Sequence, residues 1–304
     1  MTYLYLSGGM VLNQLILIPK TQAVITRYGK QVPMAYLATG FQEADTDDSG
    51  SLLSCLRVIE ATPFFAAVKE ESYRLLSLSH GSRALDVGCG TGTDAYRLAA
   101  LTGRDGMVVG IDPGAGMLEN AISSGPSLLH QGPAPSFLRM DGRFLAFPDS
   151  SFDAVREDRA LQHIREQQEV VREMFRVLRP GGRFVFFEPD WELFIIDGTD
   201  RALTRRLLHF WADSFRNGWV GRELFRLCCD GGAGEVSVLP RTMILHDLGV
   251  CDQIFGVRET LRLGVEIGVV DEEAGSRWLV ALEEADRSGR FFASFTGYLV
   301  HGRR

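Results

Sequence analysis

Short runs of apolar residues alternate along this chain with longer stretches in which apolar residues recur every three or four positions. A short apolar run bounded by turn residues is typical of a strand buried in a parallel sheet, and the longer spacing is typical of a helix packed on that sheet. In the middle of the chain the pattern predicts strands at residues 84–87, 107–111, 136–140, 152–157 and 183–188, and a helix at residues 169–178.

The same pattern continues on both sides of this segment. Apolar residues at helical spacing predict helices at residues 52–78, 200–217, 221–229, 257–268 and 271–286. Two more strands are expected at residues 235–246, with an interruption near Pro240, and at residues 291–300, which are rich in aromatic side chains. The chain is therefore predicted to have an α/β fold, a seven-stranded, mostly parallel sheet with helices on both faces.

Three glycines on alternate positions, Gly88, Gly90 and Gly92, follow the first predicted strand. Glycine adopts backbone angles that other residues avoid, and it lets a ligand approach without a Cβ atom in the way. The helix that follows offers free N–H groups and the positive end of its dipole. A glycine turn can also be no more than a turn. A ligand is favoured here because Asp112 ends the second strand, where an acidic residue can bind both hydroxyls of a ribose.

The spacing of the glycines indicates which kind of nucleotide fits. A dinucleotide-binding turn has the pattern G-x-G-x-x-G, but Thr93 stands where the third glycine of that pattern would be. A nucleoside without a pyrophosphate therefore fits better, and a nicotinamide-dependent oxidoreductase is the weaker alternative.

Five segments of the chain bear on its family. They are, in order, Leu85-Asp86-Val87-Gly88-Cys89-Gly90-Thr91-Gly92, Gly110-Ile111-Asp112-Pro113, Asp141-Gly142, Phe147-Pro148-Asp149-Ser150-Ser151-Phe152-Asp153-Ala154-Val155 and Leu178-Arg179-Pro180-Gly181-Gly182. In order and spacing they resemble the class I S-adenosylmethionine-dependent methyltransferases. The resemblance covers residues 81–189. It implies an S-adenosylmethionine cofactor and a methyltransferase domain over residues 51–304. Helical insertions at residues 191–220 and 250–288, after strands five and six, are expected to form a lid.

The resemblance also assigns residues to the cofactor. Gly88, Gly90 and Gly92 are expected to line its methionine portion, Asp86 to help hold its amino group, and Asp112 to bind its ribose. The remaining expected cofactor residues are Pro113, Asp141, Gly142 and Glu157, with the Asp-Gly pair against the adenine. An Asp-Gly pair can also serve only to cap a turn.

His163 lies just beyond the fourth strand, where the ligand crevice of an open α/β sheet lies. Because histidine titrates near neutrality, His163 is the candidate general base. The resemblance supports this role, since sugar O-methyltransferases of similar pattern use a histidine in such a Leu-x-His setting. Asp190, after the fifth strand, is expected to orient or assist it. The alternative is a histidine that caps a helix without taking part in chemistry.

Six aromatic residues between positions 191 and 219 follow the fifth strand. Trp191 and Phe194 are the nearest to the strand tip, so they are expected to bind a bulky, largely apolar methyl acceptor. Phe64 and Phe65, in the helix ahead of the first strand, are further candidates, since such leading helices form part of the substrate lid in the family. The alternative for both pairs is ordinary core packing.

The composition of the chain limits the kinds of partner that are expected. The chain has 304 residues, 45% of them apolar and 23% charged, as expected of a soluble globular protein. Its net charge of −7 argues against binding of nucleic acid. The five cysteines show no C-x-x-C spacing, which disfavours a disulfide framework or a zinc site. No clustered metal-ligand pattern is present in the sequence, so a metal-independent enzyme is expected. The cysteines are expected to be reduced, mostly buried thiols of a cytoplasmic protein. The apolar run at residues 10–18 is too short to cross a bilayer.

Residues 1–50 precede the family pattern and end in an Asp- and Gly-rich linker. Two interpretations stay open for them. They are an unstructured tail, or an apolar element that docks over the cleft or onto a second copy of the chain in a homo-oligomer. For the chain as a whole, the alternative to a methyltransferase is a cyclase or binding module that keeps the cofactor fold without transferring methyl.

Overall fold

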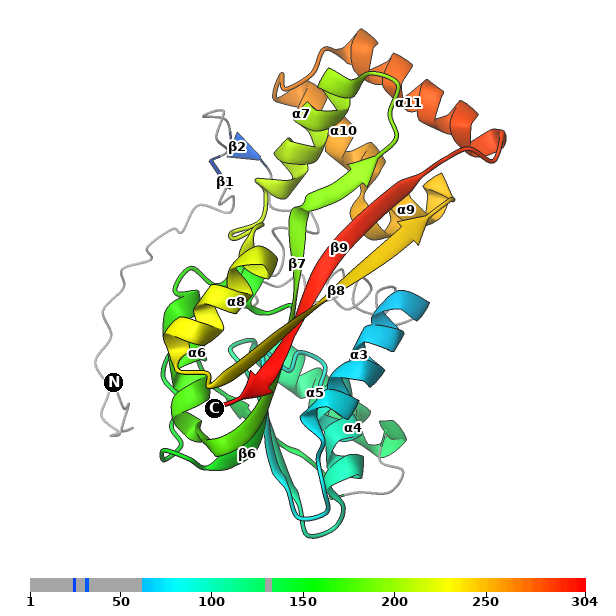
Figure 1. Cartoon of the computed structure of the whole chain (residues 1–304). Helices are drawn as coiled ribbons and strands as arrows, with labels where there is room; N and C mark the ends of the chain where they lie inside the picture. Colours follow the sequence, from blue (N-terminus) through cyan, green and yellow to red (C-terminus); the bar gives the residue numbers. More distant parts are fainter. Residues whose placement is uncertain (1–23, 26–30, 33–61, 129–132) are drawn as a thin grey trace, which may run out of the picture.

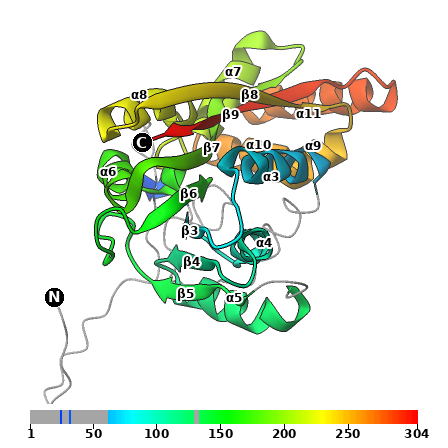
Figure 2. The same ribbon diagram turned by 60° about the horizontal axis from the view of Figure 1, so that its bottom comes forward.

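A computed structural model describes residues 24–25, 31–32, 62–128 and 133–304 of the chain. Within them, seven strands form one mixed sheet in the order β5-β4-β3-β6-β7-β9-β8 (Figure 2). Five neighbouring strands run parallel: β5 (Ser136–Arg139), β4 (Met107–Asp112), β3 (Arg83–Val87), β6 (Phe152–Asp158) and β7 (Leu178–Ile196). β9 (Ala293–Arg303) pairs antiparallel with both β7 and β8 (Glu235–Leu245). The predicted seven-stranded, mostly parallel sheet is confirmed.

Helices cover both faces of this sheet (Figures 1 and 2). α3 (Pro63–Leu76) and α4 (Thr93–Thr102) share a core with one face, and α6 (Gln167–Val177) and α8 (Val220–Gly231) share a core with the other. α5 (Ala115–Leu128) packs beside β4 and β5. The far end of the long strands β7, β8 and β9 is covered by α7 (Arg201–Ala212), α9 (Leu248–Phe255), α10 (Val257–Glu266) and α11 (Glu272–Arg287).

Aspartates begin three of the helices. The side chains of Asp200, Asp247 and Asp271 accept hydrogen bonds from backbone N–H groups three residues further on, which caps α7, α9 and α11. The helices predicted from residues 200 and 271 are therefore confirmed, whereas α9 has only eight residues and gave no clear periodicity. α3 begins with Pro63, which suits the first position of a helix.

Part of the predicted N-terminal half lies outside the described residues. This holds for positions 52–61 of the predicted first helix and for the apolar run at residues 10–18. In the extension, the structure describes only two short antiparallel strands, β1 (Val24–Ile25) and β2 (Gln31–Val32). The predictions of a docking element and of a homo-oligomer formed through it stay predictions.

β7 is longer than the strand predicted at residues 183–188. Its pairing with β9 runs from Arg183 opposite Arg303 to Ile196 opposite Ala293, with an irregularity between Asp190 and Ile195. Residues 191–196, which the sequence pattern assigned to a helical insertion, therefore extend the strand, and the helical part begins with α7. The partner strand lies far away in the sequence, so local periodicity could not indicate this extension.

β8 also differs from its prediction. The strand continues through Pro240, where an interruption was expected. β8 is the last strand in the order of the sheet, and a proline is tolerated at an edge because its missing N–H group can face away from the ladder.

Alternate residues of the central strands point to opposite faces of the sheet. On β6, Ala154 belongs to the core shared with α3 and α4, whereas Val155 belongs to the core shared with α6 and α8. The charged end of β6 follows the same alternation. Arg156 and Asp158 therefore point toward α3 and α4, and Glu157 points toward α6 and α8.

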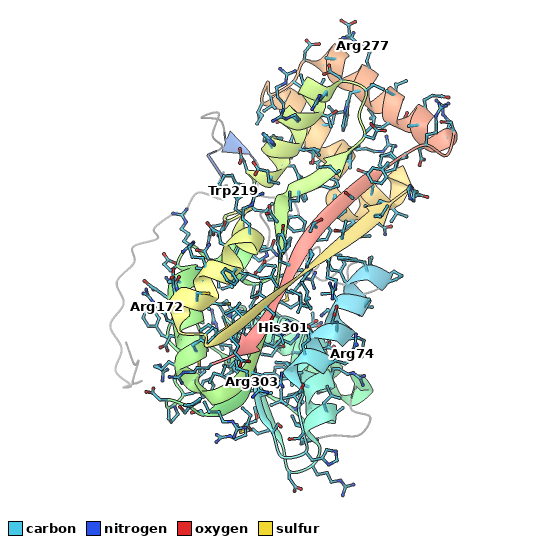
Figure 3. The ribbon with its side chains drawn as sticks, in the orientation of Figure 1. Arg74, Arg172, Trp219, Arg277, His301 and Arg303 are labelled. Atoms are coloured by element: carbon cyan, nitrogen blue, oxygen red, sulfur yellow. The ribbon has the colours of Figure 1, made fainter. Side chains whose placement is uncertain are left out.

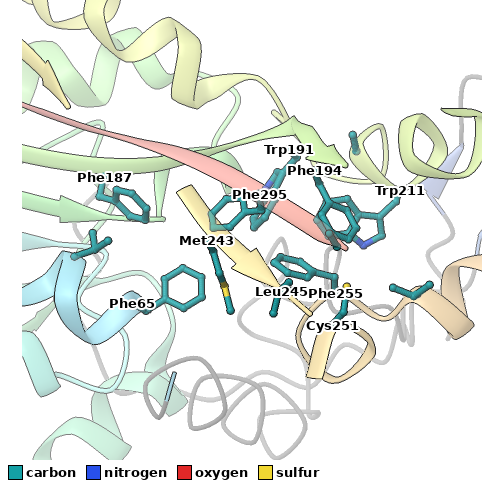
Figure 4. Packing of buried hydrophobic residues seen from close by; sticks show 14 of the residues in the cluster. Phe65, Phe187, Trp191, Phe194, Trp211, Met243, Leu245, Cys251, Phe255 and Phe295 are labelled. Carbon is teal, nitrogen blue, oxygen red and sulfur yellow. The ribbon is translucent and has the colours of Figure 1, made fainter. Parts of the chain in front are cut away.

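An aromatic cluster fills the space between β7, β9 and the helices α7 and α9 (Figure 4). The Trp191 ring lies between Phe215 and Phe295, with centroid distances of 4.7 and 5.2 Å. The Phe194 ring lies 4.5 Å from that of Phe255. Trp191 and Phe194 are 8% and 3% exposed, so both contribute to the hydrophobic core.

Replacing Phe194 with alanine is expected to lower the free energy of unfolding by about 3–5 kcal/mol, because the change removes a buried ring. Phe225 on α8 is 50% exposed, and Phe225→Ala is the matched control, with an expected change below about 0.5 kcal/mol. Urea denaturation measures both. A Phe194→Ala protein as stable as the wild type would show that this ring is not needed by the core, and would favour its predicted role in acceptor binding.

Candidate functional site

The glycine turn joins the tip of β3 to the start of α4. Gly88, Gly90 and Gly92 have φ angles of 72°, 52° and 76°, in the left-handed region. A Cβ atom on Gly88 would lie 2.4 Å from the Cβ of Ala160, and one on Gly92 would lie 2.6 Å from the ring of Phe137. Glycine is therefore required at both positions by conformation and by space.

Asp112, at the tip of β4, is held against this turn. Its Oδ2 accepts a hydrogen bond from the N–H of Gly90 at 3.0 Å, and its Oδ1 accepts one from the N–H of Gly114 at 2.8 Å. The backbone N–H groups of Gly88 and Cys89 in turn donate to the carbonyl of Ile111. These contacts bring the predicted cofactor residues of the first two strands together at one edge of the sheet, with Pro113 directly after Asp112.

A network of buried charges lies on the α3 side of this edge. The Arg156 guanidinium is 3.2 Å from Asp86, 3.0 Å from Asp94 and 2.7 Å from Asp158. From α3, Lys69 donates to Asp94 at 2.5 Å, and the hydroxyl of Tyr73 donates to the same carboxylate. Carboxylates and cations buried together in this way fix the positions of the elements that carry them.

Within this network Asp86 and Asp94 have different environments. Burial raises the pKa of Asp86 to about 7, although Arg156 opposes the shift. Burial also acts on Asp94, but Arg156 and Lys69 outweigh it and lower the pKa of Asp94 to about 2. Oδ2 of Asp86 is buried and accepts no hydrogen bond from a described residue. A buried acceptor of this kind is unfavourable unless a ligand or water supplies a donor.

Asp141 and Gly142 follow β5. The carboxylate of Asp141 accepts from the guanidinium of Arg143 at 2.6 Å, and this hydrogen bond lowers its pKa. It also accepts from the backbone N–H of Arg143, as in a turn cap. Asp141 would have to exchange one of these contacts to accept from an adenine.

Glu157, at the end of β6, holds the short turn that follows it. Its Oε1 accepts from the N–H groups of Ala160 and Leu161 at 2.6 and 3.2 Å. On the neighbouring strand β7, Glu188 lies two residues beyond Phe186, the register partner of Glu157, and accepts from the N–H of Gln162 at 3.1 Å. The sequence pattern predicts no role for Glu188. Its position could have indicated one, because the predicted strands at residues 152–157 and 183–188 both end in a glutamate.

His163 ends this turn, a single 3-10 turn at Leu161–His163. Burial, and then the charges of Arg216 and Arg159, lower its pKa to about 3, so the imidazole is neutral. The guanidinium of Arg216 also donates to the carbonyl of His163 at 3.1 Å.

Asp190 is paired with a different residue. Both of its carboxylate oxygens accept from the guanidinium of Arg222, at 2.5 and 2.7 Å. The same guanidinium lies 4.8 Å from the ring centroid of Trp219, a half-exposed side chain at the start of α8 (Figure 3). Asp190 would have to give up part of this ion pair to orient His163.

The predicted acceptor residues gather around one ring. Trp191, Phe64 and Phe65 lie 5.2, 5.7 and 6.1 Å from the ring centroid of Phe295. The indole N–H of Trp191 donates to the side-chain carbonyl of Gln162 at 2.6 Å, which joins the aromatic cluster to the turn that carries His163. Phe194 lies one ring further away, against Phe255.

Neither a cluster of metal ligands nor a membrane-spanning helix occurs in the described part of the chain. No group of three or more His, Cys, Asp or Glu residues within it is placed to hold a metal ion. No helix within it is long and apolar enough to cross a membrane.

Comparisons with known proteins agree with this geometry. A family model described as a methyltransferase domain matches residues 85–186. An uncharacterized 37.1 kDa protein of Streptomyces fradiae, in transposon TN4556, is 35% identical over 268 residues, which are 88% of this chain and 74% of that protein. The sterol 24-C-methyltransferase erg6 of Aspergillus fumigatus is 31% identical over 172 residues, which are 54% of this chain and 44% of that enzyme. The chain thus spans less than half the length of this second relative.

Solved structures show the same fold. A putative methyltransferase of Bacillus halodurans matches with a TM-score of 0.54 at 18% identity, covering 78% of this chain and 98% of that one. The cyclase SpnF matches with a TM-score of 0.52 at 19% identity, covering 90% and 98%. At these identities the likeness concerns the fold alone.

Replacing His163 with glutamine is expected to change how stability depends on pH. The ordinary pKa of histidine is 6.5, so below this pH His163 binds a proton in the unfolded chain but not in the folded chain. Wild-type stability is then lost as the pH falls from 6.5 toward about 3. Relative to wild type, the variant is expected to gain up to about 1.4 kcal/mol per pH unit in this window.

Denaturation at several pH values measures the difference in unfolding free energy between the two proteins. His80→Gln, at an exposed position, is the control for loss of an imidazole. A difference that stays constant from pH 7 to pH 4 would contradict a neutral His163 with a lowered pKa.

Proposed function

Because the chain belongs to the class I S-adenosylmethionine-dependent methyltransferases, we propose that it methylates an oxygen, nitrogen or carbon nucleophile of a small, largely apolar organic molecule. The observation that carries this proposal is the edge of the sheet where the glycine turn, Asp112 and the unpartnered oxygen of Asp86 meet. This edge offers hydrogen-bond acceptors for the N–H and O–H donors of the cofactor. The aromatic cluster next to it suits an apolar methyl acceptor.

The residues at this edge fit the methionine portion of the cofactor. Its ammonium group is a donor of the kind that Oδ2 of Asp86 requires. A Cβ atom on Gly90 would meet no described atom within 4 Å, so there is open space beside the turn. The backbone can therefore approach a ligand closely at this point.

The nucleoside portion is assigned to the neighbouring strand tips. Asp112 binds the ribose hydroxyls with its two carboxylate oxygens, and Pro113, Asp141 and Gly142 flank the adenine. Glu157 was also expected to bind the cofactor. Its described contacts are to the turn at residues 160–161, so its contribution to the cofactor site is to shape this turn.

When bound, S-adenosylmethionine supplies an electrophilic methyl group on a sulfonium. The chain has to align the nucleophile with that methyl group, exclude water and accept a proton. A sulfonium needs no Lewis acid, so we assign no metal to the reaction. The imidazole of His163 is neutral, so one of its ring nitrogens can act as the base for the proton of a hydroxyl, phenol or amine. The cations beside it oppose its charging, so the imidazolium that forms releases its proton to solvent.

The methyl acceptor is assigned to the aromatic side chains beside the turn at residues 160–163. Trp191, Phe64 and Phe65 meet around Phe295, and Trp191 is hydrogen-bonded to Gln162, the residue before His163. Ligand sites are lined mainly by apolar and aromatic side chains with few polar groups. A bulky apolar molecule that displaces part of this cluster would place its nucleophile beside the turn.

A second candidate is a reaction without methyl transfer. The cyclase SpnF has the same fold, and its likeness covers 90% of this chain. In that case the cofactor site would serve only to stabilise the fold.

Asp112→Ala is expected to weaken binding of S-adenosylmethionine, because it removes both carboxylate acceptors. Each charge-assisted hydrogen bond is worth about 1.5–3 kcal/mol, so the Kd is expected to rise about tenfold to a hundredfold for each bond lost. Calorimetry measures the Kd, and circular dichroism checks that the substitution has not unfolded the chain.

Asp112→Asn keeps one acceptor and is expected to give an intermediate Kd. Asp105→Ala, in the exposed turn before β4, is the matched control. Wild-type affinity in the Asp112→Ala protein would contradict the ribose assignment.

Incubation of the purified protein with S-adenosylmethionine and extracts of the source organism is expected to yield a product one methylene unit heavier than a component of the extract. With that acceptor, His163→Gln is expected to lower turnover by about 10²–10⁴-fold, because a general base contributes about this factor. Its Kd for the cofactor is expected to stay at the wild-type value.

Mass spectrometry and initial rates across pH distinguish the possible results. A product of unchanged mass would support the cyclase alternative and overturn methyl transfer. A methylated product formed by His163→Gln at the wild-type rate at every pH would leave the methyltransferase in place but remove His163 from the mechanism.

A further inference from the structure

Two glutamates are buried close together, Glu157 near the end of β6 and Glu188 within the neighbouring strand β7. Glu157 and Glu188 are 1% and 0% exposed, and their carboxyl groups interact directly with each other. Oε2 of each is buried and accepts no hydrogen bond from another described residue. Two ionised carboxylates in contact without water repel each other strongly, so a shared proton is the favourable arrangement.

The hydrogen bonds indicate which member carries the proton. Glu157 accepts from two backbone N–H groups, those of Ala160 and Leu161, whereas Glu188 accepts from one, that of Gln162. Donors directed at a carboxylate favour its ionised form. Glu188 is therefore the protonated member and donates its O–H to Glu157. In agreement, burial raises the pKa of Glu157 to about 7 and raises that of Glu188 well above its usual range.

The three N–H groups bound by this pair belong to consecutive residues of one turn, and the next residue is His163. The turn has further contacts beyond the pair. The side chain of Gln162 accepts from Trp191, and its backbone carbonyl accepts from the N–H of Asn217 at 3.0 Å. A shift of the turn would thus move His163 and Trp191 together.

We propose that Glu157 and Glu188 share one proton and act as positioning residues for the turn at residues 160–163, so that loss of this proton releases the turn. The effect on turnover rests on the proposed function, in which His163 accepts a proton. The effect on the structure of the turn does not. With the proton in place the pair binds all three N–H groups, whereas a doubly ionised pair would separate and give up part of these bonds.

Other titratable groups surround the pair. Asp158, next in the chain, points to the opposite face and is kept ionised by Arg159, Lys69 and Arg156 despite its burial. Its negative charge raises the pKa of both glutamates further. Burial raises the pKa of the Cys228 thiol on α8, so it stays neutral, as does His163 on the turn. Tyr298 of β9 lies opposite Glu188 in the sheet register. Among the residues that the structure describes, no cation is given as a partner of either glutamate that could replace this proton.

Glu188→Gln is the variant that tests the shared proton. The glutamine amide donates permanently to Glu157 and still accepts from Gln162, so it imitates the protonated state at every pH. Wild-type turnover is expected to fall at alkaline pH, where Glu188 gives up the shared proton, whereas this alkaline fall is expected to be absent in Glu188→Gln. Glu169→Gln, at an exposed position of α6, is the control and is expected to keep the wild-type profile.

Glu188→Ala tests the positioning. It removes the bond to Gln162 and leaves Glu157 without its donor, so the turn is expected to move and kcat to fall by about 10–100-fold. The KM for S-adenosylmethionine is expected to stay near the wild-type value, and Glu188→Gln to recover most of the lost kcat. If the alanine variant does not fold, the pH profile and spectrum of Glu188→Gln still decide the question.

Two measurements do not depend on activity. Infrared spectroscopy of the wild type near pH 7 is expected to show the C=O band of a protonated buried carboxyl that Glu188→Gln lacks; an unchanged band would overturn the shared proton. Hydrogen exchange at residues 160–163 is expected to be faster in Glu188→Ala than in wild type. Equal exchange would overturn the positioning role. Faster exchange with unchanged turnover would support the positioning and overturn the role of His163 instead.

Discussion

The Arg156 guanidinium, buried among three carboxylates, is the interaction on which the cofactor edge depends. It joins β6 to the tip of β3 through Asp86 and to the start of α4 through Asp94, and α3 is attached to the same carboxylates by Lys69 and Tyr73. Loss of one member of such a buried group leaves the remaining charges uncompensated, which is strongly destabilising. The elements around the glycine turn are therefore fixed relative to one another before any ligand binds.

At the end of β6, the side chains on the two faces of the sheet make different kinds of interaction. On the α3 face, Arg156 and Asp158 belong to an ionised network of opposite charges. On the α6 and α8 face, Glu157 meets another carboxyl group, and no cation is buried beside the pair among the described residues. One strand tip thus anchors a helix through charge on one side and a turn through hydrogen bonds on the other. The alternation of side chains along a strand is what separates the two environments.

The sequence predicted those features that depend on local pattern. Short apolar runs predicted the buried strands β3, β4 and β6 and also the edge strand β5, whose side chains are mostly exposed. Apolar residues at helical spacing predicted the helices that begin near Asp200 and Asp271. Features that depend on distant partners were missed. The extension of β7 through residues 191–196 requires β9, and the contact between Glu157 and Glu188 requires two neighbouring strand ends. The glycine turn and Asp112 lie together because they end neighbouring parallel strands, and their role in binding the cofactor stays a prediction.

Pro240 has a consequence for the outer edge of the sheet. β8 has β9 on one side and no strand of the described chain on the other, and it exposes Val238 and Ile244 there by 39% and 57%. A long edge strand with apolar side chains is a template onto which a strand of another molecule can add. Pro240 lies between these two residues and has no N–H group to offer, so it interrupts the row of donors that such an addition would need. Pro240, where the sequence pattern predicted a break in the strand, thus disfavours aggregation through the free edge of β8.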